Sequence, residues 1–130
     1  MQFFKIDRAS AQDATPSGNF GGQVWMQRLI TEEHSQDIEL LVVSFEPGGR
    51  TRPHIHAVDQ ILQIVSGRGI VATGSERRFV EPGDVVLIPS GEWHWHGAAP
   101  DSAMTHISIK RFAPTDWTVE ERLQMHRRRR

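Results

Sequence analysis

Seven histidines are the residues of this sequence most able to do chemistry, and five of them lie between positions 54 and 106. They form two His-x-His pairs and one single residue: His54 with His56, His94 with His96, and His106. Because residues i and i+2 of an extended strand point to the same side, each pair can present two imidazoles to one point. If the strand runs straight on from the first pair, Gln60 adds its amide to that side. Imidazole nitrogens with an oxygen donor and no thiolate suit a divalent first-row metal, so we predict a metal site.

The composition excludes several other kinds of site. The chain has no cysteine and therefore has no disulfide framework, zinc ribbon or thiolate chemistry. Its 130 residues carry 15 basic and 16 acidic side chains, and a net charge of −1 gives no general attraction to nucleic acid or an acidic membrane. No apolar run approaches the ~18 residues of a membrane span, and no signal-peptide stretch opens the chain, so we expect a cytoplasmic protein. The length predicts one domain over 1–130.

Short β-type runs must position these histidines. They are rich in Val, Ile, Phe, Trp and Thr, are separated by Gly and Pro, and predict an all-β sandwich or barrel. Several are apolar on both faces, which indicates contact with a second sheet or a second subunit, so we expect a homodimer or higher homo-oligomer. The predicted strands are Val24–Ile30, Ile38–Phe45, Gln60–Ser66, Gly69–Ala72, Arg77–Val80, Val85–Ile88, Trp93–Gly97 and Met104–Phe112.

The two ends of the chain differ from this pattern. Residues 9–22 are rich in Ser, Gly, Gln and Asp and predict an irregular N-terminal arm. Thr118 and Glu121 fit a capping box, which predicts a short C-terminal helix that leads into a basic tail over 118–130. We interpret the four final arginines as a solvated tail at the negative end of the helix dipole.

Two motifs carry a family resemblance. The first is Gly48, five residues, His54-x-His56, three residues, Gln60, six residues and Gly67. The second is Gly83, five residues, Pro89-x-Gly91, two residues and His94. In spacing they resemble the two motifs of the cupins, over roughly 20–112. The resemblance implies a cupin-type jelly-roll β-barrel or sandwich with a metal in its mouth, and the implied ligands are His54, His56, Gln60 and His94.

Further runs, at 45–51, 89–100 and 103–106, resemble the manganese-dependent hydroxynitrile lyases of the cupin type. This resemblance implies that manganese is the metal, that a small-molecule substrate sits on it, and that His106 handles a proton. Iron, nickel, cobalt, zinc and copper remain alternatives. The chain also departs from these relatives, because Lys110 replaces a neutral residue and Leu41 a smaller one. Gln60 stands where most cupins have Glu, although cupins with a three-His, one-Gln centre exist.

The neutral Gln60 has a chemical consequence. Three imidazoles and an amide leave the full charge on a divalent ion, which makes it a strong Lewis acid. Because the amide cannot take a proton, the base must come from elsewhere, and His96 and His106 are the candidates. For cyanohydrin cleavage, His106 or Lys110 would stabilise or protonate the expelled cyanide. We therefore predict a metal-dependent lyase with His106, His96 and Lys110 as its catalytic residues.

Two other functions stay open at this stage. One is a metal-dependent dioxygenase acting on a diketone or flavonol-like substrate. Such enzymes usually have a glutamate as ligand and base, and Gln60 argues against this alternative. The other is a non-catalytic binding module for a small metabolite, in which the histidines only line a pocket or are hydrogen-bonded core residues.

Overall fold

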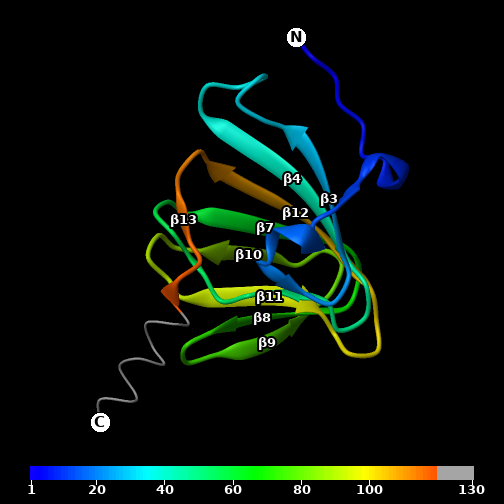
Figure 1. Cartoon of the computed structure of the whole chain (residues 1–130), viewed down its shortest axis with the longest axis vertical. Helices are drawn as coiled ribbons and strands as arrows, with labels where there is room; N and C mark the ends of the chain where they lie inside the picture. The colour runs from blue at the N-terminus through cyan, green and yellow to red at the C-terminus, as the bar shows by residue number, and fades with distance from the viewer. Residues whose placement is uncertain (120–130) are drawn as a thin grey trace.

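The computed structural model describes residues 1–119, which fold mainly as short antiparallel β-strands (Figure 1). In chain order the elements are the 3-10 turn η1 (Arg8–Ser10), β1 (Gln12–Asp13), the 3-10 turn η2 (Thr15–Ser17), β2 (Phe20–Gly21), β3 (Val24–Ile30), β4 (Ile38–Phe45), β5 (Arg50–Thr51), β6 (Ile55–His56), β7 (Gln60–Gly67), β8 (Gly69–Thr73), β9 (Arg77–Val80), β10 (Val85–Ile88), β11 (His94–Ala98), β12 (Met104–Arg111) and β13 (Thr115–Asp116). The all-β prediction is confirmed, and each predicted strand is present with ends shifted by at most one residue. The C-terminal helix and basic tail predicted over 118–130 lie outside the described residues, apart from their first two positions.

The strands form two main sheets and one small pair (Figure 1). One sheet has six strands in the order β1-β3-β4-β12-β7-β10, and the other has five in the order β2-β5-β11-β8-β9. The third is the two-stranded pair of β13 and β6. This arrangement separates the expected ligands, because β6, β7 and β11 belong to three different sheets. No helix among residues 1–119 is long and apolar enough to cross a membrane.

The core and the candidate site lie at opposite ends of β12. Met104, at the start of the strand, is 1% exposed and stands opposite Phe45 of β4, which is equally buried. Further along the same inner face come His106, Ser108 and Lys110, which are also buried. The inner face of β12 therefore passes from hydrophobic core to polar site within eight residues.

Turn geometry explains the glycine that ends the first motif. Gly67 has a φ of 76°, in the left-handed region that favours glycine. A Cβ built on it would also collide with the carbonyl oxygen of Ala103. This turn between β7 and β8 joins the two main sheets.

The N-terminal arm, 9–22, adds a short strand to each main sheet. β1 pairs with β3 and β2 pairs with β5. The Asp13 carboxylate accepts hydrogen bonds from the Thr15 backbone N–H and the Gln23 amide, both at 2.9 Å. Such an Asx turn reverses the chain between the two strands. The arm thereby reaches the mouth of the cavity described below.

The outer face of the six-stranded sheet carries an uncharged apolar row. Leu87 stands opposite Ile61, Ile61 opposite Ile109, and Ile109 opposite Leu40. Leu87 is 63% exposed and Ile61 is 39% exposed. We expect a second copy of the chain to cover this row, because an isologous contact places the same patch on both partners.

Leu87→Lys should therefore convert a dimer into a monomer, because it puts a charge into the apolar contact. Light scattering coupled to size exclusion at micromolar concentration measures the change. Phe79→Ser is the matched control, since Phe79 is an exposed apolar residue of the other sheet and should leave the mass unchanged. A wild-type protein that is already monomeric would contradict the expectation.

Candidate metal centre

Three histidines meet at one point of the structure. The ligand atoms of His54, His56 and His94 all lie within 4.8 Å of one another, and the three side chains are buried. The backbone brings two of them together, because His54 and His94 exchange N–H···O bonds of 3.0 and 3.1 Å. His56 comes from β6, immediately after this bridge. The cluster could hold a metal ion.

Hydrogen bonds fix which nitrogen of each ring faces the cluster. His54 Nδ1 lies 2.7 Å from the Arg52 carbonyl, and His94 Nδ1 lies 2.9 Å from the Glu92 carbonyl. Because a carbonyl only accepts, both Nδ1 atoms carry the proton and both Nε2 atoms keep a lone pair. His56 Nδ1 bonds the Thr115 hydroxyl at 3.0 Å, and its buried Nε2 has no partner in the described part of the chain. Such contacts orient metal-binding imidazoles, so the donor set fits a metal ion.

Burial keeps these rings neutral. Burial first, and the charge that His94 would carry second, lower the pKa of His54 to about 3. The pKa of His56 falls to about 4 for the same two reasons, and burial also lowers that of His94. A neutral imidazole is the form that binds a metal, so the three ligands need not lose protons near pH 7.

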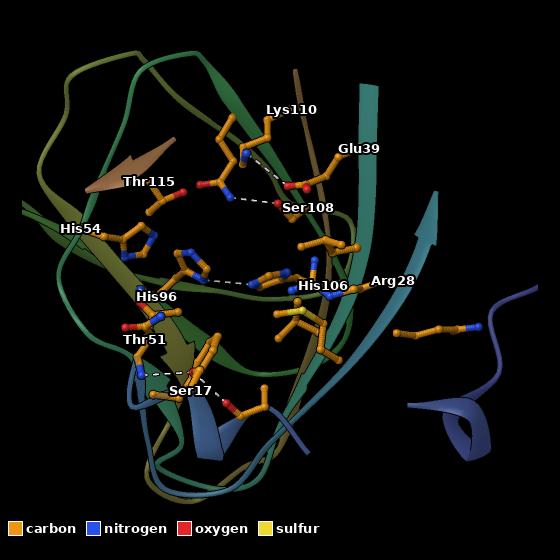
Figure 2. A pocket seen from close by; sticks show the side chains of 18 of the residues that line it. Ser17, Arg28, Glu39, Thr51, His54, His96, His106, Ser108, Lys110 and Thr115 are labelled. Carbon is orange, nitrogen blue, oxygen red and sulfur yellow. Dashed lines mark hydrogen bonds and ion pairs between the residues drawn. The ribbon is translucent and has the colours of Figure 1, made fainter. Parts of the chain in front are cut away.

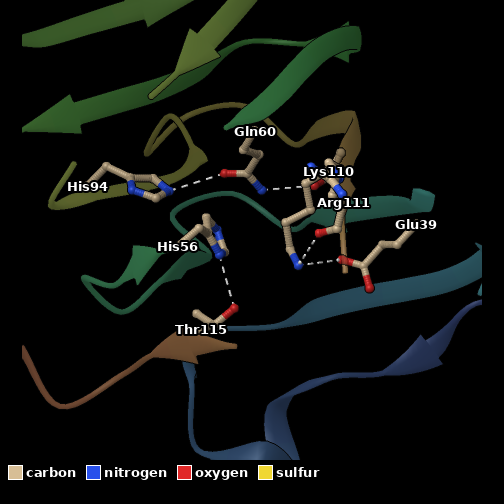
Figure 3. Close-up of polar contacts among 8 residues, drawn as sticks. Glu39, His56, Gln60, His94, Lys110, Arg111 and Thr115 are labelled. Atoms are coloured by element: carbon tan, nitrogen blue, oxygen red, sulfur yellow. Dashed lines mark hydrogen bonds and ion pairs between the residues drawn. The ribbon is translucent and has the colours of Figure 1, made fainter. Parts of the chain in front are cut away.

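Gln60 reaches the cluster by a different route from the one the sequence suggests. The strand does not run straight on from His56: β6 ends there, the chain bends, and β7 begins at Gln60 in the six-stranded sheet. The Gln60 amide donates to Ser108 Oγ at 2.8 Å, which turns its oxygen to within 3.2 Å of His94 Nε2 (Figure 3). With the His94 proton on Nδ1, these two atoms are both acceptors, and a cation between them removes their repulsion. Gln60 as a ligand stays a prediction.

The other two clustered histidines form a bonded pair in the same cavity (Figure 2). His106 Nε2 lies 2.9 Å from His96 Nδ1, and both side chains are buried. The outer nitrogens, His96 Nε2 and His106 Nδ1, have no partner within residues 1–119. Since each neutral ring carries one proton, the pair always offers one N–H and one lone pair at its two ends. Burial lowers the pKa of His106 to about 4 and that of His96 well below its ordinary range.

These depressed pKa values predict a protein that loses stability in mild acid. The unfolded chain binds protons below about pH 6.5, whereas folded His106 binds one only near pH 4. Each such histidine should therefore lower the free energy of unfolding by about 1.4 kcal/mol per pH unit as the pH falls through this window. Thermal melts of the metal-free protein from pH 8 to pH 5 measure the effect. A melting temperature that stays constant over this range would contradict it.

The polar face of β12 points inward. Strand alternation alone leaves the orientation of His106 undecided, because Thr105, Ile107 and Ile109 form the more apolar face. In the structure His106, Ser108 and Lys110 are the buried residues. Lys110 pairs with Glu39 at 3.2 Å, and their side chains are 8% and 16% exposed (Figure 3). The polar face of β12 is buried because this end of the strand lines a cavity and does not pack against the opposite sheet.

This cavity has a volume of about 800 Å³ and brings the predicted site together. Its lining includes His54, His56, Gln60, His96, His106 and Lys110, while His94 joins through the cluster. It also includes Leu41.

Sequence reasoning missed two residues that shape the centre. Thr115 of β13 holds His56, and the Trp117 ring lies 4.3 Å from the His54 ring. Thr115 pairs with His56 of β6, and Trp117 directly follows the strand β13. Fifty-nine residues separate Thr115 from His56, and no local pattern signals a contact over that distance.

A sequence model of the cupin domain matches residues 41–110, which is more than half of the chain. The chain belongs to the cupin family. This cupin is also 38% identical over 103 residues to an (R)-mandelonitrile lyase of Granulicella tundricola, an alignment that covers 78% of the chain and 79% of the relative.

Solved structures agree with the family. A cupin-like protein of Thermotoga maritima superposes on this cupin with a TM-score of 0.77 at 37% identity, covering 86% of each chain. The polyketide cyclase RemF of Streptomyces resistomycificus gives a TM-score of 0.76 over 88% of this chain and 84% of its own. At 17% identity the second likeness concerns the fold alone.

Proposed function

We propose that this cupin is a metal-dependent lyase that cleaves cyanohydrins or catalyses closely related carbon–carbon bond chemistry. One observation carries the proposal: three buried imidazoles converge beside a second, bonded histidine pair in a single cavity. The similarity to the (R)-mandelonitrile lyase supports the choice of reaction.

The donor set suits a divalent ion without thiolate ligands. His54, His56 and His94 would supply the nitrogens, and Gln60 would supply the amide oxygen. Manganese fits this set, and iron, cobalt, nickel, copper and zinc are the competing ions. Because all four donors are neutral, a bound ion would keep its full charge and polarise a hydroxyl or carbonyl oxygen.

The histidine pair can carry out the proton transfer that cyanohydrin cleavage requires. The reaction breaks the O–H bond and the bond to the nitrile carbon, forms a carbonyl, and moves one proton from the hydroxyl to cyanide. The pair His96–His106 has a lone pair at one end to accept a proton and an N–H at the other end to donate one. Burial holds both rings neutral, so the accepting lone pair is available near pH 7.

Lys110 supplies positive charge to the same cavity. Its ammonium is held by Glu39 at 3.2 Å, and it stands directly opposite Gln60 in the pairing of β12 with β7. In this position it can stabilise negative charge on an expelled anion.

Metal content and mandelonitrile cleavage, measured on the same preparation, test the proposal. Protein purified without chelator should carry close to one equivalent of transition metal per chain, and chelation followed by metal return should abolish and restore the release of aldehyde and cyanide. Metal below about a tenth of an equivalent that addition does not restore would overturn the proposal. Oxygen uptake is the parallel measurement, since consumption of oxygen with a diketone substrate would favour the dioxygenase alternative.

A further inference from the structure

Ser108 and Lys110 lie on the same face of β12, and each has a hydrogen-bond donor that is not used by another described residue. The Lys110 ammonium has three N–H bonds, and its partners within residues 1–119 are the Glu39 carboxylate at 3.2 Å and the Arg111 carbonyl at 3.5 Å. Ser108 Oγ accepts from the Gln60 amide, and its own O–H has no acceptor in that part of the chain. Ser108 is 3% exposed and Lys110 9%, so bulk water does not readily satisfy either donor. Both atoms have partners, yet each group keeps a donor that an acceptor bound in the cavity would satisfy, as buried donors normally are.

Lys110 differs from the other charged residues that line the cavity. Asp13 and Arg28 are exposed at its rim and Glu39 is half-buried, whereas Lys110 is buried. Glu39 lies on the β4 side of Lys110, and Gln60 lies on its β7 side. The ion pair is therefore a dipole whose positive end faces the metal centre (Figure 3).

We propose that Lys110 and Ser108 form a subsite for an anionic oxygen group, and that the preferred substrate of this cupin is a small molecule that carries a carboxylate beside its reacting group. Both side chains stand on the inner face of β12 at i and i+2, so one carboxylate can accept from both. The register places this subsite beside Gln60, and the reacting hydroxyl or carbonyl of the same molecule then lies at the metal centre. The inference rests on the proposed function, since it names the substrate class of that same site.

Glu39 is a positioning residue in this subsite. It occupies one N–H of Lys110, holds the ammonium inside the cavity, and competes with an incoming anion. Removing its charge should therefore strengthen anion binding, whereas a purely structural ion pair would give no such gain.

Benzoate and its neutral analogue benzamide are the probes, titrated calorimetrically into metal-free protein so that no metal can bind the carboxylate. Wild type should prefer benzoate by roughly tenfold, the size expected for a charge-assisted hydrogen bond. Lys110→Met should abolish the preference, and Glu39→Gln should increase it. The double variant Glu39→Gln with Lys110→Met leaves no buried charge unpaired and should also show no preference. Arg28→Met, which removes a cation at the rim, is the matched control and should retain it.

Equal affinities for the two probes in wild type, or a preference that survives in both Lys110 variants, would overturn the subsite. Metal content measured on the same preparations separates the two proposals. Wild-type metal loading without a benzoate preference defeats the subsite alone, whereas absent metal with a Lys110-dependent preference defeats the metal-dependent lyase alone.

Discussion

Replacing His94 with alanine is expected to abolish metal binding by this cupin. The side chain is fully buried, its Nε2 faces the cluster, and its backbone is bridged to His54. Without it, His54 and His56 leave two imidazoles, which hold a divalent ion far more weakly. We expect a loss of affinity beyond the 10- to 100-fold that follows removal of a group supporting a ligand. Metal content after dialysis against a buffered free-metal solution measures the loss.

A matched histidine controls for the substitution itself. His34 is exposed, contacts Phe4 and Thr31, and is absent from the cavity lining, so His34→Ala should keep wild-type metal content. His94→Gln preserves more of the side-chain volume and guards against loss of folding. Wild-type metal content in both His94 variants would show that the cluster is not the metal site.

Replacing His106 with alanine should slow cyanohydrin cleavage by about 10²- to 10⁴-fold, the usual contribution of a general acid or base. The substitution removes one ring of the bonded pair and leaves His96 without its 2.9 Å partner. His106 is not a member of the metal cluster, so metal content should not change. The measurement is the rate of aldehyde release under saturating metal.

Added imidazole distinguishes a proton-transfer role from a structural one. The fully buried His106 ring leaves a space when it is removed, and a free imidazole of the same size can enter it. Partial recovery of the rate with imidazole, and none with a non-basic molecule of similar size, is the expected result. A variant with normal metal content and an undiminished rate would remove His106 from the mechanism.

The sequence was a good guide to the strands because their signals are local. Runs of β-branched and aromatic residues end at glycine and proline turns, and four of the predicted strands, β3, β4, β9 and β10, have the observed ends. The His-x-His pairs were equally readable, since two-residue periodicity is a property of the backbone. The resemblance of the motifs identified the cupin family, and a match over residues 41–110 confirms it.

Strand alternation could not predict how the polar residues of β12 are oriented, and only the family resemblance pointed to His106 and Lys110 as site residues. A strand packed between two sheets buries its apolar face, and that rule favours Thr105, Ile107 and Ile109. The observed strand buries His106, Ser108 and Lys110, because its inner face at this end borders a cavity. The presence of a cavity depends on how far apart two sheets lie, which no single strand encodes.

The strands, the family and the pairing of histidines along the chain could all be read from the sequence. How those histidines are held depends on contacts between distant segments: Gln60 comes from a different sheet, Thr115 orients His56, and the Trp117 ring packs against His54. The tertiary structure also joined Lys110 to Glu39. The physical reason is range, since strand formation and turn geometry depend on neighbouring residues. The tautomers, the buried charge and the unsatisfied donors of this site depend on residues brought together from distant parts of the chain.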